Sequence, residues 1–201
     1  MTSWLQYGKD AFFIVGSIAG LFALLRPAIE SKYQRDLERA NALLAKFDEN
    51  GVMSLDSRTY SSRRIPEAFM LPFDEIKHKL SENRQEVRFT GPLRQHLRAE
   101  MEAMVKAYDA YREFVQVPEW EPRDIDSSGQ YEWLFNKNAF REGVRISDDY
   151  AKHLEGATET AELLKKRFQR FQALTELHFF EAIASKVFVP RKMRAAGLDE
   201  L

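Results

Sequence analysis

The stretch that decides the fold is residues 11–25, AFFIVGSIAGLFALL, which holds fifteen consecutive uncharged residues. Nine of the fifteen are Leu, Ile, Phe or Val, and such residues contribute about −3 to −5 kcal/mol to the insertion of a helix into a membrane. Because a helix rises about 1.5 Å per residue, this stretch spans only about 22 Å of the ~30 Å hydrocarbon core of a bilayer. Neighbouring residues must therefore complete any span.

Residues on both flanks can complete it. Trp4 and Tyr7 have amphipathic rings of the kind that lie at a membrane–water interface. Arg26 can extend its charged end to the opposite interface while the helix continues for another turn. We therefore predict a single transmembrane helix as the membrane anchor in residues 1–29, with residues 4–29 in contact with membrane lipid.

Two other interpretations of this stretch are a helix buried inside a soluble oligomer and a cleaved signal peptide. A signal peptide begins with basic residues and ends in small residues before its cleavage site. This chain has a nearly uncharged start, and its apolar run ends in Arg26 and Pro27. The residues on either side of the apolar stretch therefore favour a membrane anchor over a signal peptide.

Basic residues concentrate on the carboxyl side of the apolar stretch, where they are Arg26, Lys32, Arg35 and Arg39, whereas Lys9 stands alone on the other side. Loops rich in Lys and Arg stay on the cytoplasmic side of a membrane. We expect a single-pass protein of the cell (inner) membrane with its amino terminus outside and its C-terminal domain in the cytoplasm.

Small residues recur within the apolar stretch. Gly16 and Gly20 form a G-x-x-x-G pattern, and Ala19 and Ala23 form a second pair one turn apart. Such spacing lets the backbones of two helices in lipid approach closely. The pattern predicts self-association or packing against a membrane protein partner.

Apolar residues continue beyond Pro27 at spacings of three and four: Ile29, Tyr33, Leu37, Ala40, Leu44 and Phe47. This spacing is typical of one helix face and predicts a juxtamembrane helix over residues 30–47. Proline can kink a helix or occupy the first turn of a new one, and the sequence leaves both open.

The remaining sequence predicts a mainly α fold, with a bundle-like helical cytoplasmic domain over residues 48–190 and a polar tail over residues 191–201. Apolar periodicity predicts helices over residues 74–88, 93–115 with Thr90 as cap, 131–141, and 148 to about 187. Glycine, proline and polar residues predict a loop over 48–72 with a short strand at 52–55, and an acidic linker over 118–129.

Two pairs of residues have the spacing of metal ligands on a helix. Glu75 and His78 form E-x-x-H, and His178 and Glu181 are also three residues apart. A di-iron bundle needs E-x-x-H twice together with two further glutamates, and the sequence has no second copy. A solvated helix face and a histidine at the edge of the core explain these residues better, so we predict no metal and no cofactor.

Composition narrows the classes of function. Thirty basic and 31 acidic residues give a formal net charge of −1, so the chain has no overall positive field to hold nucleic acid. The absence of cysteine from the sequence rules out disulfides and thiolate chemistry. No phosphate-binding loop or hydrolase motif occurs, which makes an enzyme the less favoured interpretation.

These features predict a membrane-anchored scaffold, adaptor or regulatory protein that acts through protein–protein interaction. Trp120, Arg63 and Arg64 are the candidate partner-binding residues because they fall in expected loops, and the two arginines could instead meet anionic lipid headgroups. The alternatives are an oligomerising membrane-perturbing effector of the toxin or defence type, and a membrane-tethered enzyme.

Overall fold

The computed structural model describes the backbone of residues 3–55, 64–66, 69–115, 120–125, 130–135, 141–142, 145–146, 148–185 and 194. It describes the side chains of residues 17, 19–55, 69–114, 152–153, 155–185 and 194. Within these residues the chain is mainly helical and its helices pack as a bundle, as the sequence predicts.

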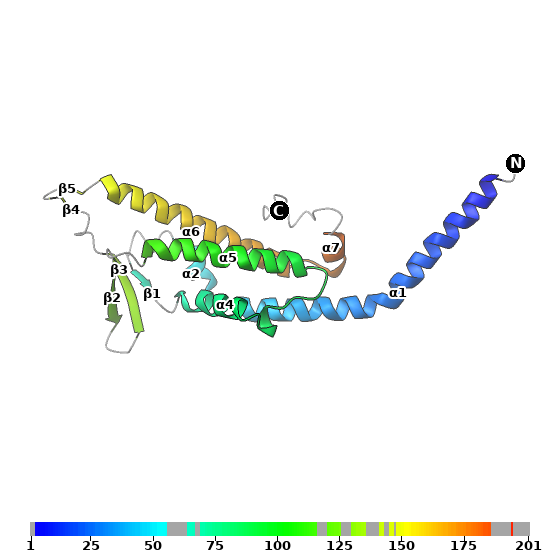
Figure 1. The fold of residues 1–201 in the computed structure, drawn as a ribbon, viewed down its shortest axis with the longest axis horizontal. Coiled ribbons are helices and arrows are strands. Elements are labelled where there is room, and N and C mark those ends of the chain that lie inside the picture. Colours follow the sequence, from blue (N-terminus) through cyan, green and yellow to red (C-terminus); the bar gives the residue numbers. More distant parts are fainter. Residues whose placement is uncertain are drawn as a thin grey trace.

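Helix α1 spans Ser3–Leu44 and contains Pro27. It is one continuous helix that changes direction along its length, so that its amino-terminal part projects away from the rest of the molecule (Figure 1). Proline inside a helix removes one backbone hydrogen bond and its ring bends the preceding turn. Pro27 therefore kinks the helix and does not start a new one. Among the described residues, no helix combines the length and the apolar character needed to cross a membrane.

The body of the molecule consists of the carboxyl-terminal half of α1 and three further long helices: α4 (Leu71–Ser81), α5 (Arg94–Val115) and α6 (Asp148–Thr175). Short helices lie between them, namely α2 (Glu49–Met53) and the 3-10 helix η3 (Gln85–Val87), and the short helix α7 (Phe179–Ala184) follows α6. Helices α5 and α6 run side by side in opposite directions (Figure 1). Helix α7 lies beside the point where α1 bends (Figure 1).

The core is formed by the apolar faces that the helical periodicity predicts. Fully buried side chains come from α5 and the residue just before it (Leu93, Leu97, Met101, Met104, Tyr108, Tyr111) and from α6 (Ala161, Leu164, Phe168, Phe171, Leu174). Phe47, just after α1, joins the layers because its ring lies 4.7 Å from that of Phe73 and 5.4 Å from that of Phe168. Such edge-on aromatic pairs add to the stabilisation from buried area.

A small antiparallel sheet lies at the end of the body opposite the projecting part of α1 (Figure 1). It consists of β1 (Arg64–Pro66), β3 (Gln130–Phe135) and β2 (Trp120–Ile125), in the order β1-β3-β2. A second pair of strands joins β4 (Arg141–Glu142) to β5 (Arg145–Ile146). The sequence predicts a helix over 131–141 and an acidic linker over 118–129. Among the described residues of these ranges, 120–125 and 131–135 form strands, so both predictions are wrong there.

Other boundaries also differ from the predictions. The sequence predicts a strand at residues 52–55. Residues 52 and 53 instead end helix α2, and residue 54 is its C-cap. The helix predicted over 74–88 ends at Ser81, because Asn83 adopts a left-handed conformation with φ of 51°. Helix α5 begins at Arg94, so Thr90 is not its cap, and the long helix predicted to reach residue 187 ends at Thr175. The predicted tail over 191–201 lies outside the described residues, apart from Arg194.

Candidate functional site

Large apolar side chains are exposed on the projecting part of α1. Leu24 is 80% exposed and Leu21 is 58% exposed, and Phe22 and Leu25 are exposed as well. These four are a majority of the seven large apolar side chains that are exposed in the described part of the chain. A side chain attached at Gly20 would meet no atom within 4 Å. This surface therefore has no covering from the rest of the described chain, and contiguous exposed apolar surface marks an interaction site.

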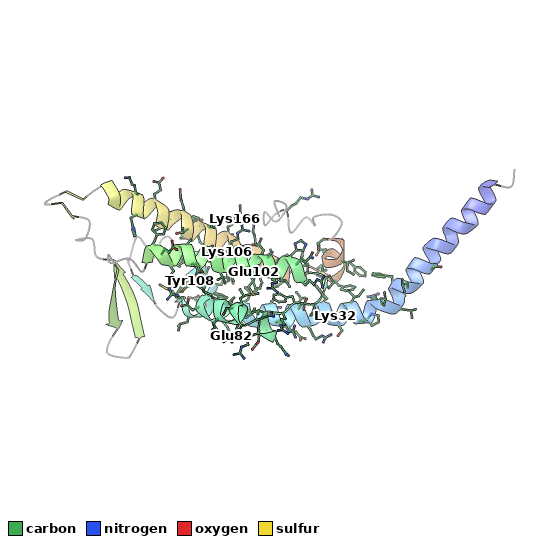
Figure 2. All side chains as sticks on the ribbon, in the orientation of Figure 1. Lys32, Glu82, Glu102, Lys106, Tyr108 and Lys166 are labelled. Atoms are coloured by element: carbon green, nitrogen blue, oxygen red, sulfur yellow. The ribbon has the colours of Figure 1, made fainter. Side chains whose placement is uncertain are left out.

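Charged side chains cover the body of the molecule instead. Figure 2 places Lys32 on the part of α1 that runs along the body, Lys106 on α5 and Lys166 on α6, and all three are exposed. Between residues 17 and 25 the sequence has no charged residue. Helix α1 thus changes from a charged to an apolar exterior close to its bend.

Arg26 marks this change. Its Nε lies 3.4 Å from Oε2 of Glu30, and its guanidinium lies 5.5 Å from the centre of the Phe180 ring. A guanidinium over an aromatic face is attracted by the negative potential of the ring. The contact ties the beginning of the projecting segment to helix α7.

The carboxyl-terminal half of α1 is fixed to the body by three side chains that bond to backbone groups. The hydroxyl of Tyr33 donates to the carbonyl of Leu177, and Arg39 donates to the carbonyl of Arg88. The third side chain is Asp36, which lies on the same inward face of the helix. Because these partners belong to loops at one end of the body, α1 holds that end together.

Asp36 makes the most buried of these attachments, with 1% of its surface exposed. Its carboxylate accepts the backbone N–H of Thr90 at 2.9 Å and that of Gly91 at 2.6 Å. Glycine is required here because a Cβ at residue 91 would lie 2.9 Å from Oδ2 of Asp36 and 3.1 Å from the backbone of Lys32. Asp36 is not among the predicted site residues, although its position in the inward stripe between Tyr33 and Ala40 could have identified it.

Helix α7 is fixed against α1 by the next set of contacts. The ring of Phe179 meets that of Tyr33 edge-on at 5.6 Å, and burial together with the negative charge of Glu181 raises the pKa of the Tyr33 hydroxyl. The backbone N–H of His178 donates to Oε2 of Glu181 at 2.8 Å. His178 and Glu181 thus form a capping box at the start of α7, the arrangement that satisfies the first free N–H groups of a helix.

The other pair of candidate metal ligands makes separate ion pairs. The carboxylate of Glu75 lies 2.5 Å from Nζ of Lys46 and 3.0 Å from that of Lys79, and hydrogen bonds from these two lysines lower the pKa of Glu75. His78 is exposed and its Nε2 lies 3.2 Å from Glu82. Within the described residues, no group of three or more His, Asp or Glu side chains is arranged to hold a metal ion.

A buried ion cluster joins α5 to α6. Glu100 is fully buried, and its Oε1 lies 3.0 Å from Nη1 of Arg167 and 3.8 Å from Nη1 of Arg170. Charges in the interior must be paired because their removal from water is costly. This cluster links α5 to α6, and no local pattern in the sequence predicts it.

The remaining candidate residues have little or no described side-chain environment. Trp120 is the first residue of β2 and lies opposite Phe135, and Arg64 is the first residue of β1. Arg63 lies outside the described residues, and Trp4, Tyr7 and Gly16 lie in the part of α1 for which the structure describes the backbone alone. Ala19 and Ala23 are exposed, as is Arg35, whose Nε donates to the carbonyl of Ser31 at 3.3 Å.

Comparison with known proteins gives no relative, since no family model, no curated protein and no solved structure matches the chain.

Proposed function

We propose that the chain is a single-pass protein of the cell (inner) membrane, anchored by residues 4–29, whose helical domain acts in the cytoplasm as a scaffold or adaptor. The observation that carries this proposal is the exposed apolar surface of α1 beyond Arg26, on a helix whose other half is fixed into the core. A partner bound to the domain would be held at a defined position relative to the membrane.

The physical reason for lipid as the occupant is the free energy of burial. Complete burial of a Leu or Phe side chain contributes about 1.5–3 kcal/mol, and Leu21, Phe22, Leu24 and Leu25 range from 38% to 80% exposed. Their transfer from water therefore contributes about 5 kcal/mol in total. Residues 11–16, AFFIVG, belong to the same helix and extend the apolar sequence towards its amino terminus.

Carbonate extraction of cell membranes tests the anchor. The variant carries Leu21→Glu and Leu24→Glu, and the matched control carries Leu71→Glu and Leu163→Glu, which alter exposed leucines on α4 and α6. Wild type and control should stay in the membrane pellet at alkaline pH, whereas the variant should be released, because charged side chains oppose insertion, by up to about 2.5–3.5 kcal/mol each at the membrane centre. Release of the wild type, or retention of the variant, would contradict the proposal.

The small sheet supports the second half of the proposal. Residues directly opposite one another in antiparallel strands share a face of the sheet. The register therefore places the aromatic residues Trp120, Tyr131, Trp133 and Phe135 on one face, together with Pro122 and Asp124. Aromatic residues are enriched at the centres of protein interfaces, and this sheet lies at the end of the body away from the projecting helix (Figure 1).

A partner-binding test uses cross-linking in intact membranes, with Trp120→Ala as the variant and Glu121→Ala as the control. Glu121 lies on the opposite face of the same strand, across from Leu134. Loss of a cross-linked protein in the first variant and its retention in the second is the expected result. Identical cross-linking in both variants would remove Trp120 as a binding residue.

The open space at Gly20 favours one alternative, the oligomerising membrane-perturbing effector. Ala19 and Ala23 are exposed next to this glycine, so two copies could approach closely in lipid. Such an effector should depolarise cells when overexpressed, and Gly16→Leu combined with Gly20→Leu should abolish the effect. Cells that keep their membrane potential would count against this alternative.

A further inference from the structure

Helix α7 presents one large aromatic side chain to the outside. Phe180 is 60% exposed, whereas its neighbours on the other face, Phe179 and Ala182, are buried in the core. The ring of Phe180 lies 5.5 Å from that of Phe179. The helix is thus fixed in place by its inner face, and Phe180 is held in a defined position at the surface.

The position of Phe180 relative to α1 is set by direct contacts. The guanidinium of Arg26 lies 5.5 Å from the centre of its ring, and Tyr33 binds the segment just before α7 through the carbonyl of Leu177. Figure 1 shows α7 next to the bend of α1, on the side towards which the amino-terminal part projects. Phe180 therefore lies at the level along α1 where the apolar surface ends.

We propose that α7 rests on the membrane surface and that Phe180 enters the boundary between lipid headgroups and acyl chains, as a second membrane contact. This inference rests on the proposed insertion of residues 4–29, which places Arg26 at the interface. A ring in contact with Arg26 then lies at headgroup depth, where aromatic residues are favoured and the apolar face of an interfacial helix is buried.

The charges around Phe180 are compatible with a phospholipid surface. Arg26 lies over the ring, and Lys32 and Arg35 are exposed further along α1. The nearby acidic groups already have partners, because Glu30 pairs with Arg26 and Glu181 accepts the backbone N–H of His178. The basic side chains can therefore face lipid phosphates while Phe180 lies at the depth of Arg26.

The consequence is a fixed orientation of the domain. Helix α1 alone would leave the domain free to rotate about the axis of the anchor, whereas a second contact at α7 directs one end of the body towards the bilayer. The aromatic face of the sheet, at the opposite end, would then be held away from the membrane and accessible to a partner (Figure 1).

The chain contains no cysteine, so single-cysteine variants can report on lipid contact without further changes. The full chain is prepared as Phe180→Cys, Leu24→Cys and Lys106→Cys, labelled with an environment-sensitive fluorophore, and reconstituted in vesicles of phosphatidylcholine and phosphatidylglycerol. Spin-labelled lipids in the same vesicles quench any fluorophore that contacts them. Lys106 is exposed on α5 and serves as the control for the body (Figure 2).

Quenching at residues 24 and 180, with none at residue 106, is the expected result, and shallow spin labels should quench residue 180 more than deep ones. If residue 24 is quenched and residue 180 behaves like residue 106, the second contact is refuted while the anchor stands. Blue-shifted but unquenched emission at residue 180 would mean that protein covers Phe180, and this also overturns the inference. If residue 24 is not quenched either, both the anchor and the second contact fail.

Discussion

Replacement of Asp36 by alanine tests how α1 is fixed to the domain. The carboxylate is almost completely buried and accepts the N–H groups of Thr90 and Gly91. Alanine would remove the acceptor of the buried N–H of Gly91 and of the part-buried N–H of Thr90. An unsatisfied buried donor costs about 1–3 kcal/mol, so we expect a loss of about 3 kcal/mol for the two together. For a chain of this size that corresponds to a fall in Tm of about 6–12 °C.

The assay is thermal unfolding of the full chain in detergent micelles, followed by the helical circular dichroism signal. Asp109→Ala is the matched control because Asp109 forms an exposed ion pair with Lys77, at 2.7 Å, and such pairs contribute about 0–1 kcal/mol. Asp36→Asn should fall between the two, since it keeps one oxygen acceptor. A fall in Tm for Asp36→Ala no larger than that of the control would refute this assignment.

Three further predictions concern Gly91, Glu100 and Glu75. Gly91→Ala should lower Tm, because its Cβ would lie 2.9 Å from the Asp36 carboxylate, whereas Gly20→Ala, which meets no atom within 4 Å, should leave Tm unchanged. Glu100→Gln should cost about 3 kcal/mol in urea unfolding, because it removes the buried negative charge that faces Arg167 and Arg170. An NMR titration should give Glu75 a pKa below 4.5 that rises in Lys46→Met. Since the folded-state pKa is lowered, the stabilisation from Glu75 is complete above its unfolded pKa and is lost as the pH falls through the folded value.

The long helices could be predicted from the sequence because their signal is local and repeated. In α5 the large apolar residues recur at spacings of three and four over many turns, and this stripe is fully buried: Leu97, Met101, Met104, Tyr108 and Tyr111. The stripe that continues past Pro27 likewise forms one helix with the apolar stretch before it. Periodicity of this length leaves little choice of secondary structure.

The sheet could not be predicted because its strands are short and their pairing is non-local. Residues 130–135, QYEWLF, are too few to separate strand from helix by periodicity. Their pairing with β1 joins residues far apart in the sequence, such as Arg64 and Leu134. Only the fold brings such partners together, so the local pattern gave the wrong element.

The site shows the same division between local and non-local signals. His178 and Glu181 are three residues apart, which suits a metal pair on one helix and also a capping box, and the end of α6 at Thr175 makes it a cap. Phe180 could not be recognised because its relation to Arg26 is tertiary. Asp36 interrupts an apolar stripe, and an acidic residue at such a position is a signal that can be used in other sequences.

The most direct measurement of the proposed topology is labelling of single cysteines in intact cells with a membrane-impermeant maleimide. Ser3→Cys lies at the start of α1, and Lys106→Cys lies on the surface of α5. If residues 4–29 span the membrane with the domain in the cytoplasm, residue 3 is labelled in intact cells and residue 106 only after permeabilisation. Labelling of both residues under the same condition would place them on one side of the membrane and contradict the proposal.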